Sequence, residues 1–315
     1  MTSVCILPSP RAPQALDNLS GSPGSPFNEH SRQTAYRTII RLSQRCQKLP
    51  PSLFVEGTLL TSGLITGGGF ADIYQGQYRD QTVAIKRMRM FHGGAAEIIR
   101  ARKVLFREAL VWQRLKDPCI LPFMGIDADL FTGQFCMISP WMSNGCILTY
   151  LEKNRSLNLD IELLIGIGHG LVYLHSENVI HGDLRGANIL MDSHGCPLLA
   201  DFGLAYYADA TRTSTTDGSV RWMAPELLLP DKFDLNFQRT YATDIYAFGC
   251  VCLEVYTRKH PFPEIKTDSE LVIKIYNSSL RPTRPSIEES QGVEIADEWW
   301  AFILSCLKED SSERP

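Results

Sequence analysis

The stretch from 181 to 226 holds the side chains with the clearest capacity for chemistry in this chain. It contains three short motifs in order: H-G-D-L-R-G-A-N at 181–188, A-D-F-G at 200–203 and A-P-E at 224–226. Asp183 can accept a proton, and Arg185 supplies a fixed positive charge. Asn188 and Asp201 offer the oxygen ligands that Mg²⁺ prefers. A carboxylate that orients a hydroxyl, metal-binding oxygens and a cation are what phosphoryl transfer requires, so the pattern predicts that chemistry.

A second candidate group precedes these motifs. In V-A-I-K (83–86), the two-residue period of a strand puts Ala84 and Lys86 on one face, and a small residue beside an ammonium suits a nucleotide. A lysine in the middle of a strand needs a charge partner, and Glu108 in F-R-E-A-L-V-W is available. Taken alone, this pattern also fits an ordinary surface strand.

The segment I-T-G-G-G-F-A-D-I-Y-Q-G (65–76) places consecutive glycines between two strands. Backbone amides in such a turn can approach phosphate oxygens closely. Compared with G-x-G-x-x-G and aligned on Phe70, the three glycine positions hold Thr66, Gly68 and Ala71. The match is imperfect, and an ordinary glycine-rich hairpin turn fits equally well.

Together, these ordered motifs resemble the protein kinase family over roughly residues 61 to 315. The resemblance implies an α+β, bilobal protein kinase fold: a small antiparallel β-sheet N-lobe with one long helix, then a larger, mainly α-helical C-lobe. It also implies a serine/threonine kinase that moves the γ-phosphate of ATP to protein hydroxyls, with ATP and Mg²⁺ as cofactors. Two segments resemble the tyrosine-kinase-like group, and particularly its large fungal branch. They are G-S-V-R-W-M-A-P-E-L-L (218–228) and I-S-P-W-M-S-N-G (138–145).

The resemblance assigns roles to individual residues. Asp183 would orient and deprotonate the substrate hydroxyl, and Asn188 and Asp201 would ligate magnesium. Arg185 stands where serine/threonine kinases carry a lysine that contacts the γ-phosphate. Lys86 would bind the α- and β-phosphates and pair with Glu108.

The resemblance also implies a set of nucleotide-binding residues, in which Ser139 would be a small gatekeeper. They are Ile65, Gly67, Gly68, Gly69, Ile73, Ala84, Lys86, Glu108, Ser139, Met142 and Leu190. Three further residues are expected to support the site. His181 would pack under Phe202 as structure, Asp244 would hold the catalytic loop from a buried helix, and Ser219 would hydrogen-bond near Asp183 through its hydroxyl.

Several positions depart from the family pattern. Gly182 replaces the arginine that normally pairs with a phosphorylated loop residue, so activity is expected to depend little on phosphorylation there. The loop nonetheless holds several hydroxyls, at Thr211, Thr213, Ser214, Thr215 and Thr216. Arg314 would pair with Glu226. Because kinases normally continue with another helix, the chain is expected to be truncated after Pro315.

Two alternatives stay open. The departures at Thr66, Ala71 and Gly182 would also suit a pseudokinase that binds nucleotide or acts as a scaffold without turnover. A tyrosine-specific kinase ranks third, because tyrosine kinases usually place an arginine where this chain has Ala187. Retention of Asp183 argues for turnover, since a binding-only module does not need a proton acceptor.

The elements that must position these residues follow from periodicity. A Pro/Ser-rich disordered tail is expected over 1–30, and an amphipathic helix with a linker over 31–60, in which Pro50-Pro51 would end the helix. The kinase domain is expected over 61–315, with an N-lobe at 61–142 and a C-lobe at 143–315. Strands are expected at 59–66, 70–78, 82–88, 121–127 and 134–139, and long helices at 95–116, 160–177 and 242–257.

The composition limits the classes of partner that are expected to bind the chain. The formal net charge is -4, so neither nucleic acid nor an anionic membrane is expected to attract the chain, and no apolar run is long enough for membrane insertion. The nine cysteines show no C-x-x-C pair. Scattered cysteines of this kind fit a reducing compartment, so a cytoplasmic or nuclear location is expected. The protein substrates are unknown.

Overall fold

A computed structural model describes residues 29–67, 71–89, 95–154, 160–207, 219–233, 237–278 and 280–315. Its contacts divide the chain into two compact units. The first runs to Lys116 and includes Leu121–Trp141; the second comprises Asp117–Ile120 and Met142–Pro315. Most of the tail expected over 1–30 lies outside the described residues.

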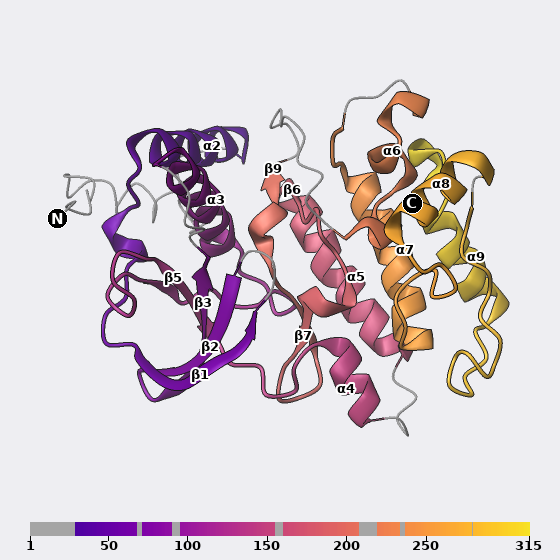
Figure 1. Cartoon of the computed structure of the whole chain (residues 1–315), viewed down its shortest axis with the longest axis horizontal. Helices are drawn as coiled ribbons and strands as arrows, with labels where there is room; N and C mark the ends of the chain where they lie inside the picture. The colour runs from indigo at the N-terminus through magenta and orange to yellow at the C-terminus, as the bar shows by residue number, and fades with distance from the viewer. Residues whose placement is uncertain are drawn as a thin grey trace. The chain divides into compact units, whose positions relative to one another are not determined.

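The first unit contains a five-stranded antiparallel sheet in the order β1-β2-β3-β5-β4 (Figure 1). Its strands are β1 (Leu59–Gly67), β2 (Ala71–Tyr78), β3 (Gln81–Met88), β4 (Gly125–Asp127) and β5 (Cys136–Pro140). The turn between β2 and β3 is Arg79-Asp80, with φ of 46° and 61°. Left-handed conformations at both central residues match the right-handed twist of the flanking strands.

One face of this sheet packs into the core of the first unit. Tyr74, Tyr78, Val83, Ile85, Cys136 and Ile138 form a buried cluster there. The long helix α3 (Ala95–Arg114) also belongs to this unit and contacts β4. β4 is shorter than the strand expected over 121–127, because it pairs with β5 only from Gly125 onward.

Helix α2 (Glu29–Cys46) precedes the sheet and packs on α3. The expectation that Pro50-Pro51 ends this helix is wrong. The helix ends earlier, because Gln47 adopts a left-handed φ of 54° and the Lys48 N–H turns back to the Ser43 carbonyl at 3.2 Å. That is a hydrogen-bonded C-terminal cap. The prolines instead open a short 3₁₀ turn, η1 (Pro51–Leu53).

The second unit is mainly helical. Its helices are α4 (Ile147–Lys153), α5 (Asp160–Ser176), α6 (Pro225–Leu228), α7 (Tyr241–Thr257), α8 (Asp268–Ser278) and α9 (Asp297–Cys306). Two small ribbons interrupt them: β6 (Val179–Ile180) with β9 (Tyr206–Tyr207), and β7 (Ile189–Met191) with β8 (Pro197–Leu199). Together with the sheet of the first unit, this confirms the predicted fold class.

Helix α7 forms the core of the second unit and contacts α4, α5 and α9. It is buried along nearly its whole length, and a reciprocal capping box of Thr240 and Thr243 closes its N-terminus. Arg258, with φ of 59°, terminates it. A capped helix buried in this way is a rigid support for the loops that pack on it. Within the described residues, no helix combines the length and apolarity needed to cross a bilayer.

Candidate active site

In the first unit, the side chain of Lys86 meets that of Glu108. Val83 and Ile85 are fully buried on one face of β3, which leaves Ala84 and Lys86 on the other. Lys86 Nζ lies 2.7 Å from Glu108 Oε1, and the Glu108 side chain is 1% exposed. The predicted pair is therefore present, with α3 supplying its carboxylate.

Other predicted nucleotide-binding residues share this face of the sheet. Ile73 of β2 lies opposite Lys86, and Ser139 of β5 lies opposite Ala84. Directly opposed residues in antiparallel strands project to the same side, so these four side chains form one patch. Ser139 is buried, and Ile65 on β1 is half exposed.

Gly67 lies beside an ion-pair cluster of the first unit. Arg87 and Arg89 both hold the buried carboxylate of Asp72, at 2.6 Å and 2.7 Å. Hydrogen bonds from Arg87 and then Arg89 lower the pKa of Asp72. A Cβ at Gly67 would meet the end of the Arg89 side chain, which is flexible and 39% exposed, so this contact does not by itself require a glycine. Gly68 and Gly69 lie outside the described residues.

In the second unit, Asp244 anchors the loop that carries the motif chemistry. Its carboxylate is almost fully buried at the start of α7 and accepts the backbone N–H groups of His181 at 2.8 Å and Gly182 at 2.9 Å. His175 Nε2 lies 3.0 Å from the same carboxylate. Buried N–H groups need acceptors, and here one side chain supplies two of them. The supporting role expected of Asp244 is confirmed.

His181 has a structural environment. Its Nδ1 accepts the Asp183 N–H at 3.2 Å, so Nε2 carries the proton and donates to the Ala200 carbonyl at 3.1 Å. Its ring centroid lies 5.6 Å from that of Phe202, and the residue is fully buried. The packing of His181 against Phe202 is confirmed.

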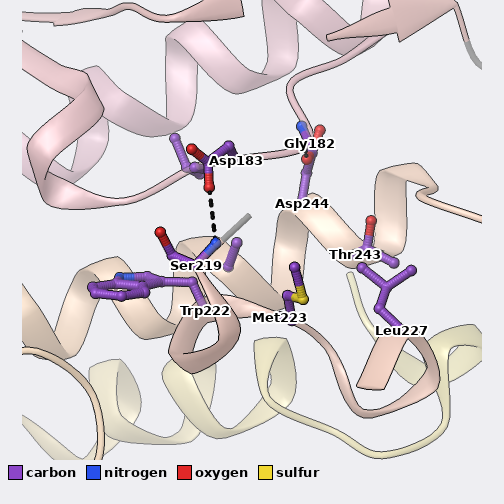
Figure 2. A pocket seen from close by; sticks show the side chains of 10 residues that line it. Gly182, Asp183, Ser219, Trp222, Met223, Leu227, Thr243 and Asp244 are labelled. Atoms are coloured by element: carbon purple, nitrogen blue, oxygen red, sulfur yellow. Dashed lines mark hydrogen bonds between the residues drawn. The ribbon is translucent and has the colours of Figure 1, made fainter. Parts of the chain in front are cut away.

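Asp183 is fixed by several polar groups. The Asn188 amide donates to its carbonyl at 2.8 Å and to its carboxylate at 3.0 Å, and the Ser219 N–H points at the other carboxylate oxygen from 3.4 Å (Figure 2). Burial raises the pKa of Asp183 and the charge of Asp201 adds to the rise, while Arg185, His181 and Asn188 oppose it. The arrangement gives an oriented carboxylate of increased basicity.

Ser219 does not act as expected. The hydrogen bond to Asp183 comes from its backbone N–H, because Ser219 is the residue that leads into the 3₁₀ turn η4 (Val220–Trp222). Figure 2 shows the hollow beside this bond, lined also by Trp222, Met223 and Leu227. The hydroxyls predicted between Thr211 and Thr216 lie outside the described residues.

The oxygen donors fit magnesium. Asp201 takes a left-handed φ of 63°, caps the turn η3 (Phe202–Leu204) and adds to the negative field at Asp183. Asn188 lies beside this segment, because its carbonyl accepts the Ala200 N–H at 2.9 Å, and neighbouring carboxylate and amide oxygens suit a divalent cation. Among the described residues no three His, Cys, Asp or Glu side chains gather as a metal cage. Mg²⁺ ordinarily takes one or two carboxylates plus substrate phosphates, so this donor set is sufficient.

Arg185 lies between two acidic groups and an indole. Its Nε is 3.8 Å from Asp183 Oδ2, and its guanidinium lies 5.8 Å from the ring centroid of Trp222. Glu254 of α7 accepts both the Trp222 indole N–H at 2.6 Å and the Gly186 N–H at 2.8 Å on one oxygen. Burial raises the pKa of Glu254 to about 7, against the hydrogen bonds from Gly186 and Trp222 and the charge of Arg185.

Gly182 and Arg239 occupy complementary space. Gly182 has a left-handed φ of 79°, and a Cβ there would lie 2.9 Å from Arg239 Cδ and 3.0 Å from the Leu204 carbonyl oxygen. Arg239 is 2% exposed, and its guanidinium lies 5.2 Å from the ring centroid of Phe237. The space next to Gly182 is thus occupied by a buried arginine, Arg239, which lies two residues before the start of α7.

Two predicted nucleotide-binding residues lie in the loop after β5 and in β7. Met142 accepts the Gly145 N–H at 3.0 Å, and Gly145 in turn accepts the Met191 N–H at 2.9 Å. A bridge between Cys146 and Leu190 ties this loop to β7. Met142 and Leu190 are therefore parts of one connected segment of the second unit.

Arg314 closes the second unit with a buried ion pair. Its two terminal nitrogens bind the two carboxylate oxygens of Glu226 at 2.6 Å and 2.8 Å, and it also donates to the Ala242 carbonyl at 2.9 Å. The predicted pair of Arg314 with Glu226 is confirmed.

Sequence reasoning missed Glu254, Trp222 and Arg239. For Glu254 a signal existed, because an acidic residue inside the apolar run I-Y-A-F-G-C-V-C-L-E-V-Y must be buried with partners if that run is a core helix. Arg239 offered no comparable pattern. Its importance depends on the absence of a side chain at Gly182, which only the fold brings beside it.

Comparison with known proteins agrees with the geometry. Residues 60–315 match the family described as protein tyrosine and serine/threonine kinase. The chain is similar to the serine/threonine-protein kinase STY46 of Arabidopsis thaliana, with 29% identity over 80% of this chain and 41% of that protein. It is 30% identical to the serine/threonine/tyrosine-protein kinase HT1 of the same plant, over 82% of this chain and 65% of HT1. It is also 26% identical to the probable serine/threonine-protein kinase drkB of Dictyostelium discoideum, over 79% of this chain and 34% of drkB.

This chain therefore spans less than two thirds of the length of each of these relatives. They come from a plant and an amoeba, so they do not support the finer expectation of a fungal branch.

Proposed function

Because the chain belongs to the protein tyrosine and serine/threonine kinase family, we propose that it transfers the γ-phosphate of ATP to serine and threonine hydroxyls of proteins. One observation carries the proposal. The Asp183 carboxylate is oriented from two sides, by the Asn188 amide and the Ser219 N–H, in surroundings that raise its pKa. A binding module has no use for a basic carboxylate positioned in this way.

In the proposed reaction, Asp183 accepts a hydrogen bond from the substrate hydroxyl and takes its proton as the oxygen becomes a nucleophile. Asn188 keeps the carboxylate in one orientation. Arg185, 3.8 Å from Asp183, places a permanent cation where negative charge passes to the acceptor. The hydroxyl oxygen bonds to the γ-phosphorus of ATP as the bond from that phosphorus to the β-phosphate oxygen breaks, so ADP leaves, and Mg²⁺, when bound, would neutralise part of the phosphate charge. Asn188 and Asp201 would hold the metal, and Lys86, paired with Glu108, would hold the phosphates.

The nucleotide-binding set remains part of this proposal. The shared face of Ile73, Ala84, Lys86 and Ser139 supports it, because a small and largely apolar patch beside an ammonium suits an adenine nucleotide. Gly67 stays in the set on the strength of the glycine-rich segment alone.

Serine and threonine are the favoured acceptors in this proposal. Arg185 stands two residues after Asp183, at the place of the family's γ-phosphate lysine. STY46 is named a serine/threonine-protein kinase, and drkB a probable one. HT1 is named a serine/threonine/tyrosine kinase, so transfer to tyrosine is a measurable alternative. Membership of the tyrosine-kinase-like group, and of its fungal branch, belongs to the same proposal.

We further propose a cytoplasmic or nuclear location. All eight cysteines in the described part of the chain are free thiols. Burial raises the pKa of Cys136 to about 12 and that of Cys306 to about 11, so these thiols stay protonated and unreactive. Free thiols of this kind suit a reducing compartment.

The decisive experiment is transfer of labelled γ-phosphate from ATP to a generic protein, with and without Mg²⁺, followed by phosphoamino-acid analysis. The matched control is Asp183→Asn, which keeps the side-chain volume and one oxygen for the Ser219 N–H. We expect the variant to lose about 10³-fold of the rate, because the proton acceptor is gone. Equal rates for both proteins would refute the assignment, as would nucleotide binding without any transfer, the behaviour of a pseudokinase. Label on tyrosine alone would refute the acceptor class.

A further inference from the structure

The helix that carries Glu108 is contacted by a segment outside the family match. The match begins at residue 60, whereas α2 and the turn that follows it end by Val55. Helix α2 nevertheless packs against α3, and α3 is drawn between α2 and the five-stranded sheet (Figure 1). The segment 29–55 is therefore in a position to decide where α3 lies.

Helix α2 has a defined face for this contact. Tyr36, Ile40 and Ser43 are buried at helical spacing, whereas Arg41 and Leu42 on the other side are exposed. An amphipathic helix with a buried stripe of this kind is held by its neighbour and not only by its own backbone.

Helix α2 contacts α3 at residues that lie before and after Glu108 in the sequence. Gln44 donates its amide to the Lys103 carbonyl at 2.9 Å, and the Arg114 guanidinium lies 4.6 Å from the ring centroid of Tyr36. Lys103 and Arg114 lie on one stripe of α3, roughly three turns apart, and Glu108 lies roughly 120° to 140° around the helix from them. Helix α3 is thus fixed along one stripe while another presents the carboxylate to Lys86.

The segment after α2 makes a second, independent attachment. The Val55 N–H donates to the Ile126 carbonyl at 2.9 Å, which adds a backbone bridge to β4. Phe54 packs on Phe135, and Phe135 packs on Phe106 of α3, each with ring centroids 5.9 Å apart. Phe106 is two residues from Glu108, so this chain of rings reaches the same part of α3.

A glycine inside the family match makes room for this attachment. Gly125 starts β4 with φ of 151°, and a Cβ there would lie 3.0 Å from the Leu53 carbonyl oxygen and would collide with the Val55 side chain. The sheet is therefore shaped to receive residues 53–55. A merely appended tail would not require such a fit.

We propose that residues 29–55, here called the N-terminal brace, position α3 so that Glu108 reaches Lys86. The pair joins two side chains at 2.7 Å, so a displacement of α3 by a few ångströms would separate them. Alignment of this pair is a condition of phosphoryl transfer in kinases. The residues of the N-terminal brace are positioning residues that act through Glu108. Their effect on activity rests on the proposed function, whereas their effect on α3 does not.

The test compares two variants of the full chain that place the same charge on α2. Ile40→Asp disrupts the buried face, and Leu42→Asp adds the charge two residues away, where the side chain is 52% exposed. Amide hydrogen exchange of α3 between Leu105 and Val111 is measured without nucleotide. We expect about tenfold faster exchange in Ile40→Asp and no change in Leu42→Asp. Equal exchange in both variants would overturn the proposal. Tyr36→Ala serves as a milder second disruption if Ile40→Asp fails to fold.

Activity then separates positioning from simple stabilisation. We expect kcat/KM to fall about tenfold in Ile40→Asp, yet to fall no further when the same change is made in a Glu108→Gln background, because both changes disable one pair. Losses that multiply in the double variant would show that the N-terminal brace does not act through Glu108. If the wild type transfers no phosphate, the proposed function fails while the exchange measurement still decides on the N-terminal brace.

Discussion

Helices α3 and α7 both bring carboxylates to the chemistry of this domain, but they hold them in different ways. Glu108 of α3 pairs with the side chain of Lys86, so the contact depends on the positions of a helix and a strand. Asp244 and Glu254 of α7 instead accept backbone N–H groups of His181, Gly182 and Gly186, which fixes a loop directly. Helix α7 has a capping box at its N-terminus and contacts α4, α5 and α9, whereas α3 contacts α2 and β4.

The comparison suggests a division between a fixed support and an adjustable part. Where a buried side chain accepts backbone N–H groups of a loop, its loss leaves buried donors unpaired. The loop geometry and the free energy of unfolding then change together. A pair of side chains between two elements can separate without unfolding either. Loss of the Asp244 carboxylate should therefore change stability and activity together, and loss of the Glu108 carboxylate should change mainly activity.

The largest effect is expected for Asp244→Ala. The change removes the acceptor of two buried N–H groups and the partner of His175. We expect the free energy of unfolding to fall by about 3 kcal/mol or more and transfer to be abolished. Urea denaturation and the phosphotransfer assay measure the two quantities. Asp244→Asn, which keeps one oxygen, should lie between alanine and wild type. Lost activity at unchanged stability would remove the distinction between the two helices.

A smaller but more selective effect is expected for Glu108→Gln. The amide oxygen can still accept from Lys86, but the charge that orients the ammonium is lost. We expect kcat/KM to fall about 100-fold. The free energy of unfolding should fall by less than in Asp244→Ala, because the amide oxygen still accepts from Lys86 and the Lys86 side chain is 16% exposed. Glu56→Gln, at an exposed position of the same unit, is the control and should change neither quantity. A stability loss as large as that of Asp244→Ala would show that α3 is as rigid a support as α7.

A third effect depends on pH and concerns Glu254. Its pKa is raised from 4.5 to about 7, so the folded state binds the proton more tightly than the unfolded chain. Stability from this group is fully present below about pH 4.5 and is lost as pH rises to 7, by up to about 3 kcal/mol. Glu254→Gln cannot ionise, so we expect it to match wild type at pH 4.5 and to exceed it at pH 8. Chemical denaturation at both pH values measures this, and a variant less stable than wild type at pH 8 would show that the ionised carboxylate is favoured.

Sequence predicted the parts of this site whose chemistry resides in local motifs. Asp183, Asn188 and Asp201 lie in short patterns, and the period of V-A-I-K put Lys86 on the correct face of β3. The spacing of apolar residues likewise located β2, β3 and α5, because residues that face a core recur at a fixed interval along a strand or a helix.

What sequence could not predict depends on contacts between distant segments. The end of α2 was misplaced because a left-handed Gln47 has no strong sequence signal, whereas Pro50-Pro51 has an obvious one. Ser219 was assigned through its hydroxyl, although its backbone N–H faces Asp183. Gly125 is favoured by its φ of 151°, and its close approach to residues 53–55 becomes visible only when that segment is seen against β4.

The surroundings of Gly182 restrict how an arginine could arise at this position during evolution. A Cβ there would lie 2.9 Å from Arg239 Cδ, so an arginine introduced alone should be deleterious. A smaller residue at 239 would not open the position by itself, because the Leu204 carbonyl oxygen 3.0 Å away and the left-handed φ of 79° would still oppose a side chain. Acquiring the arginine therefore requires a rearranged loop backbone as well as a change at Arg239.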